Sequence, residues 1–577
     1  MDDVTEEAAR HPHRRLMRMM PSLLATATLL LGLVDVISAV TPEQRYRLHA
    51  LRQFVPIEIS HAASASTAVI GILLVMLAHG LRRRKRRAWR AAVVLMALSV
   101  ALHLAKGLDA EEASVALIVL AVLITQRHEF YAAGDPTTRK RAPLVFVGML
   151  AASFVTGIAL LYARGGALVG HPPFTDRVQE VLWGLIGVGG PVHFRSERAS
   201  DLFFVFLLAL GAATALVTAY LALRAPEPAA TLDAATEGQL RELLRRQGAR
   251  DSLGYFSLRR DKAVVFSATG KAAISYRVVS GVMLASGDPV GDPEAWPGAI
   301  RAFLDVCRSH AWVPAVMGCG EQGGEVWVRE AGLRAIELGD EAIVDVAEFT
   351  LEGRAMRNVR QMVTRVERAG YKTDVRRIRD MTPQEISEVR RQAAAWRGAE
   401  VERGFSMALG RFGDPADGDC VAVTAHKDDR LAAVLHFVPW GTDGLSLDLM
   451  RRDRAADPGL NELLIVAALR AAPDLSVNRL SLNFSVFRSA LERGGKLGAG
   501  PVLRLWREVL LIASRWFQIE SLYRFNAKFR PVWEPRFVCY PHARDVPRIA
   551  IAALEAEAFL VWPHQWWRLR RDQRAIG

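Results

Sequence analysis

Six apolar runs lie within the first 225 positions of the chain and predict membrane-spanning helices. The first run follows a basic segment and is longer than the apolar core of a signal peptide, so we expect it to be retained as a span. The fourth run is short. The runs are Met19–Val40, Ile57–Gly80, Ala88–Leu104, Ala113–Gln126, Ala142–Ala163 and Leu202–Leu223. Together they predict an N-terminal all-α transmembrane bundle of six helices over residues 1–224.

The basic residues between these runs predict the topology, because cytoplasmic loops are enriched in Lys and Arg. The segment after the second run reads LRRRKRRAWR, and the one after the fourth contains Arg127, Arg139, Lys140 and Arg141. Both segments are expected on the cytoplasmic side, which also places the N-terminus and everything after Arg224 in the cytoplasm. A nucleic-acid-binding or localisation patch is the alternative interpretation of LRRRKRR.

Beyond the last run the pattern changes to strands alternating with helices, and one order of elements occurs twice. Each copy has a strand pair, a helix and a further strand. The first copy is KAAISYRV, VMLASGD, GAIRAFLDVCRSHA and VPAVMG; the second is DRLAAVLHFV, LSLDLMRR, LNELLIVAALRAA and RLSLNFS. We therefore predict a cytoplasmic α/β (α+β) region of two tandem acetyltransferase-like (GNAT-like) domains, although the copies share few identical residues.

The expected domain order after the membrane part follows from these patterns. A linker and helix take up 225–250, the first GNAT-like domain 251–350, a basic connecting helix 351–380, the second GNAT-like domain 381–545 and a basic amphipathic tail 546–577. The second GNAT-like domain is expected to carry the active site.

The stretch Ser446–Arg470 in the second copy combines a strand, a turn at Asp457, Pro458 and Gly459, and a helix. Asp448 and Arg451 lie three residues apart on the strand, so they should project to opposite faces unless the strand bends or ends between them. An acid and an anion-binding arginine at a strand end beside a helix N-terminus suit an acyl-transfer site. The alternative is an edge strand with a solvated, charged end.

The segment EFTLEGRAMRNVRQMVTRVERAGY between the copies is strongly amphipathic. Its apolar side is formed by Met356, Val359, Met362, Val363 and Val366. Its other side carries Arg354, Arg357, Arg360, Arg365 and Arg368. A solvated face is the usual explanation for such charge, but solvated faces normally mix both signs. A phosphate-binding surface, for an RNA backbone or a lipid headgroup, is the other interpretation.

Charge, composition and missing motifs limit which partners and which reaction types the chain can have. The formal net charge of +13 points to an anionic partner, either a membrane surface or a nucleic acid. The four cysteines have no metal-binding spacing and suit burial in a reducing compartment. The chain has no P-loop, G-x-S-x-G, H-E-x-x-H or paired C-x-x-C motif. The Gly-rich turn that cradles coenzyme A in acetyltransferases is missing too, so we expect another acyl donor, no cofactor and no metal.

The soluble part resembles the synthase domain of the bacterial aminoacyl-phosphatidylglycerol synthases, the lysylphosphatidylglycerol synthetase or multiple peptide resistance factor family. The matching pieces occur in the family's order and cover most of Ser252–Pro541. They are GDPVG, MRNVRQMVTRVERAGY, ERGFSM, SLDLMR, LNFS and NAKFRPVWEPRF. SLDLMR and KFRPVWEPR together are the most specific of these.

The resemblance implies transfer of an amino acid, often lysine or alanine, from aminoacyl-tRNA to the glycerol hydroxyl of phosphatidylglycerol. The product carries less negative charge, which in the family gives resistance to cationic peptides. The implied partners are aminoacyl-tRNA, phosphatidylglycerol and the anionic bacterial inner membrane, in which the chain would be a multi-pass protein with both termini cytoplasmic. Longer members add flippase-like spans or a lysyl-tRNA synthetase domain, and we expect neither here.

The same resemblance implies roles for individual residues. Glu402 and Asp448 would lie near the aminoacyl group, holding its ammonium or assisting removal of the acceptor's proton. Arg451 and Lys528 would bind phosphate or stabilise the developing oxyanion. The implied substrate-binding residues are Arg452, Asn483, Arg536 and Glu534. For each of these residues a structural ion pair is the alternative.

Two other functions stay open at this stage. One is aminoacyl transfer to a different acceptor, such as a peptidoglycan precursor or a sterol-like lipid. The other is a membrane sensor or lipid-translocating protein with a degenerate acyltransferase domain. The sequence does not specify the amino acid carried or the oligomeric state.

Overall fold

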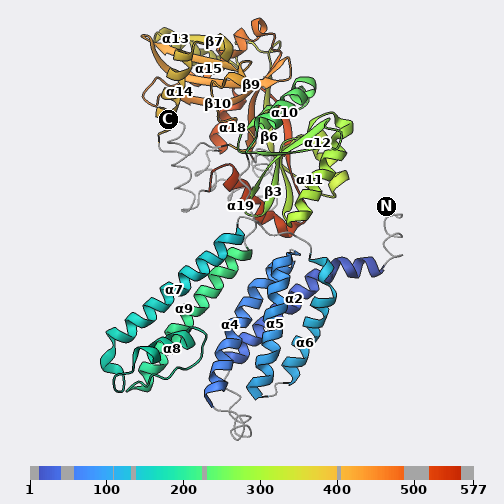
Figure 1. The fold of residues 1–577 in the computed structure, drawn as a ribbon. Coiled ribbons are helices and arrows are strands. Elements are labelled where there is room, and N and C mark those ends of the chain that lie inside the picture. Colours follow the sequence, from blue (N-terminus) through green and yellow to red (C-terminus); the bar gives the residue numbers. More distant parts are fainter. Residues whose placement is uncertain are drawn as a thin grey trace, which may run out of the picture. The chain divides into compact units, whose positions relative to one another are not determined.

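The computed structural model describes residues 12–40, 57–82, 84–107, 110–130, 138–223, 231–398, 404–486 and 519–560 (Figure 1). The chain divides into two compact units, the first made mainly of residues 1–226 and the second of most of residues 227–577.

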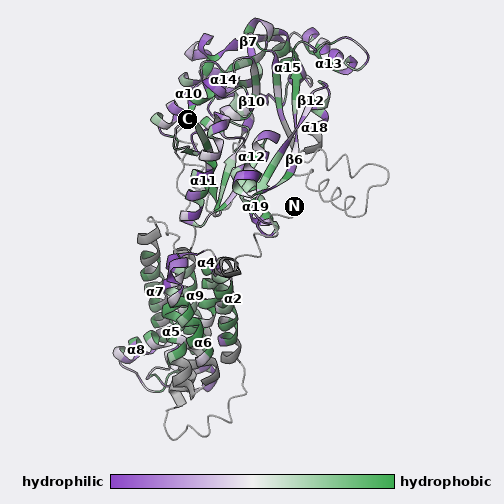
Figure 2. Cartoon of the chain, turned by 90° about the vertical axis from the view of Figure 1, so that its right-hand side faces the viewer, coloured by the Kyte–Doolittle hydropathy of each residue, from purple (hydrophilic) through white to green (hydrophobic). Residues whose placement is uncertain are grey.

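The first unit is helical, and a helix lies at each of the six predicted apolar runs. Its helices are α2 (Pro12–Val40), α4 (Ile57–Arg82), α5 (Arg86–Gly107), α6 (Ala110–Thr125), α7 (Thr138–Ala163), α8 (Phe174–Leu185) and α9 (Glu197–Leu223). Figure 2 shows that hydrophobic residues predominate along these helices. Within the described part of the chain, only Leu144–Ala163 and Glu197–Ala219 are long and apolar enough to cross a membrane. Met20–Val36, Val69–Arg82 and Ala113–Thr125 are shorter apolar segments.

Helices α2 and α4 approach each other closely at two glycines. A Cβ atom at Gly32 would lie 2.6 Å from the carbonyl oxygen of Gly71, and one at Gly71 would lie 2.6 Å from that of Gly32. Small residues permit such close backbone contact. In lipid the hydrophobic effect does not drive helices together, so their association depends on close packing of this kind.

The second unit is built on one mixed sheet. Its strands are β1 (Ala263–Phe266), β2 (Ala272–Val279), β3 (Val282–Ser286), β4 (Val290–Gly291), β5 (Val313–Cys319), β6 (Arg334–Asp345), β7 (Lys372–Arg377), β8 (Val421–Lys427), β9 (Arg430–Trp440), β10 (Gly444–Arg452), β11 (Arg479–Val486) and β12 (Val532–Tyr540). The order along the sheet is β1-β2-β3-β5-β12-β6-β11-β10-β9-β8-β7, with β4 beside β2.

The helices of this unit lie on the two faces of the sheet. They are α10 (Ala234–Gln247), α11 (Trp296–His310), α12 (Glu321–Ala331), α13 (Arg357–Arg368), α14 (Pro383–Arg397), α15 (Leu460–Ala471), α18 (Ile519–Ala527) and α19 (Val546–Ala556). In the second half, α13 and α15 share one apolar core with the sheet. Residues of α10, α14 and α19 contribute to a second core. Helix α15 is apolar nearly all round because most of its length is buried.

The predicted repeat is present in the fold. In the first half, β2 and β3 pair antiparallel, α11 follows, and β5 lies parallel to β3. In the second half, β9 and β10 pair antiparallel, α15 follows, and β11 lies parallel to β10.

The two halves exchange their last strands. Strand β6 of the first half pairs with β11 of the second, and β12 of the second half pairs with β5 of the first. Strands β6 and β12 also pair with each other at the centre. The sheet is therefore continuous across the boundary that we predicted at residue 350.

The predicted connecting segment 351–380 contains two different elements. Helix α13 buries Val359, Val363 and Val366, as its pattern predicted, and Met362 is half-buried. The chain then enters the edge strand β7. The predicted C-terminal tail begins with the apolar helix α19, while residues 561–577 lie outside the described part.

Candidate functional site

Strand β10 contains a bulge at Asp448. Leu447 lies opposite Phe437 of β9, whereas Leu449 lies opposite the preceding residue, His436. Asp448 is therefore an extra residue in β10 without an opposite residue in β9, which is a β-bulge.

The bulge brings Asp448 and Arg451 to the same face of the sheet. Met450 packs in the core beneath α13 and α15, whereas Leu449 packs against the core on the opposite face. Arg451 lies opposite Val434, which belongs to the same core as Leu449. The expected separation of Asp448 and Arg451 onto opposite faces does not occur, because the extra residue interrupts the alternation.

The carboxylate of Asp448 is held by two contacts. Its Oδ2 lies 2.6 Å from Nδ1 of His436, and its Oδ1 accepts a hydrogen bond from the Leu409 amide at 2.5 Å. His436 is fully buried, and its ring meets that of Phe412 edge to face at 4.9 Å. Its Nε2 atom has no hydrogen-bond partner among the described residues. The histidine and the amide therefore fix the orientation of Asp448.

Strands β10 and β11 part next to this bulge. Their parallel pairing ends at Ser446 and Ser481. Beyond that point the side-chain amide of Asn483 donates to the carbonyl of Leu447 and, at 3.5 Å, to that of Met407. Asn483 adopts a left-handed backbone with φ of +68°, which asparagine tolerates better than most residues. It therefore links β10 and β11, just beyond the point where their pairing ends, to the loop that contacts Asp448.

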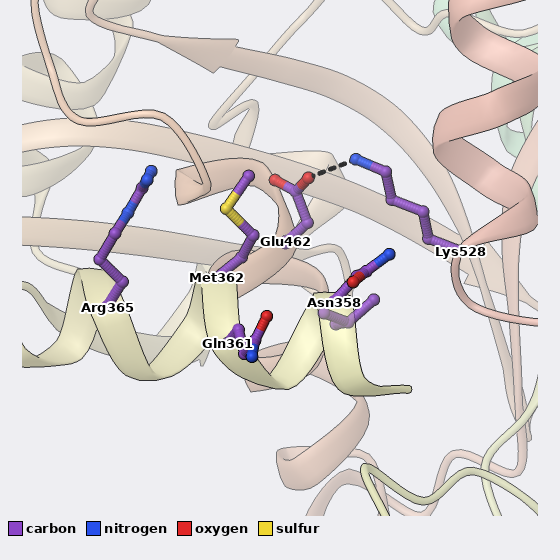
Figure 3. Close-up of a pocket in the computed structure, with 7 residues that line it drawn as sticks. Asn358, Gln361, Met362, Arg365, Glu462 and Lys528 are labelled. Atoms are coloured by element: carbon purple, nitrogen blue, oxygen red, sulfur yellow. Dashed lines mark hydrogen bonds and ion pairs between the residues drawn. The ribbon is translucent and has the colours of Figure 1, made fainter. Parts of the chain in front are cut away.

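Lys528 lies elsewhere, beside helices α13 and α15. Its Nζ is 2.8 Å from Oε1 of Glu462, which is only 8% exposed and sits in the first turn of α15. The pair borders a pocket of about 470 Å³. Figure 3 shows Arg365, Met362, Gln361 and Asn358 on α13 near this ion pair. Two predicted residues, Lys528 and Arg365, are thus brought to one pocket, and its remaining lining residue is Val359.

The arginines of the basic segment are all exposed. Arg360 and Arg365 donate to backbone carbonyls, of Leu351 and Pro458 respectively. Arg354, Arg357 and Arg368 make no hydrogen bond or ion pair within the described residues. A row of exposed guanidinium groups is therefore available to an anionic partner.

Arg536 lies in a buried ionic cluster. Its Nε is 2.9 Å from Oε2 of Glu341, its Nη1 is 2.8 Å from Oδ1 of Asp251, and its Nη2 is 2.7 Å from Oγ of Ser252. Burial, reinforced by the charge of Asp251, raises the pKa of Asp288 in this cluster to about 7, although Arg536 opposes the shift. A structural role accounts for all three guanidinium nitrogens.

This cluster occupies the place in the first half that corresponds to the Asp448 region of the second. Gly318 in β5 has φ of +75° and sits at a register shift between β5 and β12, as Asn483 does between β11 and β6. The Gly318 carbonyl accepts from Arg536 at 3.4 Å, and the Gly320 amide donates to Asp288 at 2.8 Å. In the first half, the counterpart of the Asp448 region is therefore occupied by the side chains of the Arg536 cluster.

The remaining predicted residues have local or exposed environments. Arg452 donates to the carbonyls of Asp453 and Ala456 in the turn that follows β10. Glu534 is exposed on β12. Glu402 lies outside the described residues.

Sequence reasoning missed His436 and Glu462. A lone histidine in the apolar strand DRLAAVLHFV resembles a core residue, and only the partner strand reveals its contact with Asp448. Glu462 gave a weak signal, as an acid among the apolar residues of LNELLIVAALRAA. The predicted burial of the four cysteines is confirmed.

Comparison with known proteins identifies both parts of the chain. Residues 241–540 match the family described as phosphatidylglycerol lysyltransferase, C-terminal. Residues 16–223 match the transmembrane region of lysyl-tRNA synthetase. The first unit is thus a transmembrane region, and the chain is a membrane protein.

Curated relatives are similar along almost the whole chain. A lysylphosphatidylglycerol biosynthesis bifunctional protein LysX from Mycobacterium avium (strain 104) is 41% identical over 575 residues, covering 97% of this chain and 48% of the relative. The protein of the same name from Rhodococcus opacus (strain B4) is 42% identical over 552 residues, covering 93% of this chain and 49% of the relative. The chain spans about half the length of these relatives.

A solved structure shares the fold of the second unit. The structure of L-PGS from Bacillus licheniformis aligns with a TM-score of 0.50 and 21% identity, covering 58% of this chain and 99% of that one. It supports the predicted GNAT-like mixed α/β fold. Since the match to this family covers more than half of the residues, the chain belongs to the phosphatidylglycerol lysyltransferase C-terminal family.

Proposed function

We propose that this protein transfers a lysyl group from lysyl-tRNA to the glycerol hydroxyl of phosphatidylglycerol. Family membership and the similarity to the LysX proteins support this activity. The product, lysyl-phosphatidylglycerol, carries less negative charge than its precursor, and we propose that it protects the cell against cationic peptides.

The observation that carries the proposal is the bulge that places Asp448 and Arg451 on one face where β10 and β11 part. The glycerol hydroxyl attacks the ester carbonyl carbon, the new ester bond forms, and the bond to the ribose oxygen of the tRNA breaks. The hydroxyl proton passes to that ribose oxygen, so atoms and charge balance. Because the ester is already activated, the reaction needs positioning and charge stabilisation rather than a strong nucleophile.

Asp448 and Arg451 would divide this work. A carboxylate offers about four lone-pair directions, so Asp448 can hold the lysyl ammonium or receive the hydroxyl proton while keeping its contacts to His436 and Leu409. Arg451 would stabilise the oxyanion that develops on the ester carbonyl. Glu402 remains a candidate for the aminoacyl group on its family resemblance alone.

The anionic parts of both substrates would contact basic residues elsewhere. The exposed arginines of the basic segment suit the tRNA backbone, and the pocket of Lys528 and Arg365, beside α13 and α15, suits a phosphate. Asn483 would act by holding β10 and β11 together just beyond the end of their pairing. Arg452, Glu534 and Arg536 remain candidates for substrate binding, although the contacts of Arg536 equally suit a structural role.

We further propose that the first unit spans the bacterial inner membrane six times, with both termini in the cytoplasm. Helices at all six apolar runs support this number. An ion pair also joins Arg84, after the second run, to Glu129, after the fourth, at 2.8 Å. The two segments predicted to be cytoplasmic are thus in contact, as they would be on one side of a membrane.

Membranes containing the full chain test the activity directly. They are incubated with phosphatidylglycerol and, in turn, with a set of charged tRNAs, and the lipids are analysed by ninhydrin staining and mass spectrometry. We expect a ninhydrin-positive lipid whose mass equals that of phosphatidylglycerol plus one lysyl group. No such lipid with any charged tRNA would contradict the proposal. A modified lipid with phosphatidylglycerol unchanged would indicate a different acceptor.

A further inference from the structure

The loop 404–409 forms one wall of the Asp448 environment. The amide of Leu409 donates to Oδ1 of Asp448 at 2.5 Å, and the carbonyl of Met407 accepts from Asn483 at 3.5 Å. The loop position therefore determines where the Asp448 carboxylate points.

The other end of this loop is held by one carboxylate, that of Glu557. Its Oε2 accepts from the Phe405 amide at 2.6 Å, and its Oε1 accepts from the Ser406 amide at 3.1 Å and from the Ser406 hydroxyl at 2.6 Å. The Gly404 amide also donates to the Glu557 carbonyl at 3.4 Å. Glu557 is 4% exposed, and Phe405 and Ser406 are fully buried.

These contacts depend on the acceptor-only character of a carboxylate. Two buried backbone amides and a hydroxyl all donate to it, so an uncharged group that must also donate cannot satisfy all three. Gly404 has φ of +116°, and a Cβ there would lie 2.3 Å from the Cβ of Ala408, so the loop adopts a turn that requires glycine. The loop conformation is thus specified at its start as well as at Asp448.

Glu557 reaches the loop from the other half of the sheet. It follows helix α19, which packs on β2 and β3 of the first half. The helix is anchored there by Arg548, which donates to the Ser280 carbonyl at 2.9 Å, and by Glu555, which accepts from the Ser280 hydroxyl at 3.0 Å. Glu557 lies beyond residue 540, where the match to the family ends.

We infer that Glu557 is a positioning residue for the transfer reaction, holding the loop 404–409 so that Leu409 orients Asp448. This inference rests on the proposed function. The first half thereby contributes to the site through α19, although its own corresponding position is filled by the Arg536 cluster.

Glu557→Gln in the full chain tests the inference. The carboxamide keeps one oxygen that can accept from Ser406. Its NH₂ group then faces the Phe405 amide, so two N–H donors face each other and the Phe405 amide loses its acceptor. We expect kcat to fall about 10- to 100-fold while the KM for lysyl-tRNA and for phosphatidylglycerol changes by less than about twofold. Glu555→Gln, two residues earlier on the same segment, is the matched control; its carboxamide oxygen can still accept from the Ser280 hydroxyl, so α19 stays anchored and kcat should be unchanged.

A second readout does not depend on activity. Amide hydrogen exchange in detergent should become faster at 404–409 in Glu557→Gln, including at Leu409, and should be unchanged there in Glu555→Gln.

Normal kcat in Glu557→Gln, or unchanged exchange at 404–409, would overturn the inference. The same holds if activity falls only in proportion to the amount of folded protein. A wild-type protein that makes no aminoacyl lipid would instead refute the proposed function, and the exchange data would still decide whether Glu557 holds the loop.

Discussion

Nδ1 of His436 and Oδ2 of Asp448 lie 2.6 Å apart, with the histidine fully buried and the carboxylate 5% exposed. The pair joins β9 to the bulge of β10. It leaves part of the lone-pair capacity of Asp448 for a substrate.

His436 should tolerate asparagine better than leucine. The amide nitrogen of asparagine can take the place of Nδ1 and keep the contact with Asp448, whereas leucine keeps the bulk and loses the contact. We expect His436→Leu to lower kcat about 10-fold or more, and His436→Asn to retain more activity than His436→Leu. Asp448→Asn should abolish lipid formation. The measurements are the steady-state rate of lysyl-lipid formation and the melting temperature. Equal activities for the two His436 variants would show that the contact has no role.

Replacing Lys528 should lower both the stability and the transfer activity, and a second substitution should restore the stability alone. Lys528→Met leaves the nearly buried Glu462 without its cation, which should lower the free energy of unfolding by about 1–3 kcal/mol as well as reduce transfer. Adding Glu462→Gln should restore stability, because it removes the unpaired charge, but should not restore transfer. Thermal melts and kcat/KM measurements on both variants check this. Full activity in the stable double variant would exclude Lys528 from the site.

The arginines of the basic segment should act on tRNA affinity and its salt dependence. Replacing Arg354, Arg357 and Arg368 by glutamine should raise the KM for lysyl-tRNA with little change in kcat. If all three contact phosphates, the slope of log KM against log salt should fall by about 2–3. The control is Arg470→Gln, since Arg470 is exposed but already paired with Glu367 at 3.2 Å. An equal effect in the control would indicate general electrostatics rather than a binding surface.

The buried cluster around Asp288 should make stability depend on pH. The pKa of Asp288 is raised to about 7, above the value expected in the unfolded chain, so the folded state binds more protons between these values. This contribution to stability is fully present below the unfolded pKa, and it is lost as the pH rises from about 4 to about 7. Asp288→Asn keeps the acceptor for the Gly320 amide and should flatten that decline. Denaturant unfolding between these pH values measures it, and an unchanged slope would contradict the assignment.

Arg536 should be required for folding. Arg536→Met would leave Asp251 and Glu341 buried without their cation, and removing one partner of a buried ion pair costs about 3–5 kcal/mol. The expected outcome is a large fall in the melting temperature. A stable but inactive Arg536→Met variant would instead support the substrate-binding role implied by the family resemblance.

Local patterns predicted much of the fold. The amphipathic pattern of α13 identified its buried side, and the repeated order of strands and helices identified both copies. These features depend on neighbours in the sequence, so periodicity reveals them. Partner choice among strands depends on distant residues, and nothing in the sequence of β6 or β12 indicated that the two would be exchanged.

The site was only partly predicted, because it too depends on contacts between residues that are distant in the sequence. Family motifs pointed to Asp448, Arg451 and Lys528, but the spacing of Asp448 and Arg451 predicted opposite faces, because a bulge has no clear sequence signal here. His436, Glu462 and Glu557 come from segments far from Asp448 or Lys528 in the chain. Their contacts become visible only when strands, helices and loops are assembled.

The exchange of β6 and β12 also sets the order in which the protein can be completed during synthesis. Strand β5 acquires its neighbour β12 only after residue 540 has left the ribosome, more than 200 residues after β5 itself. Until then the first half exposes an unpaired strand edge, which favours association with other chains. A chain cut between the two halves would therefore leave β5 without its neighbour β12 and β11 without its neighbour β6.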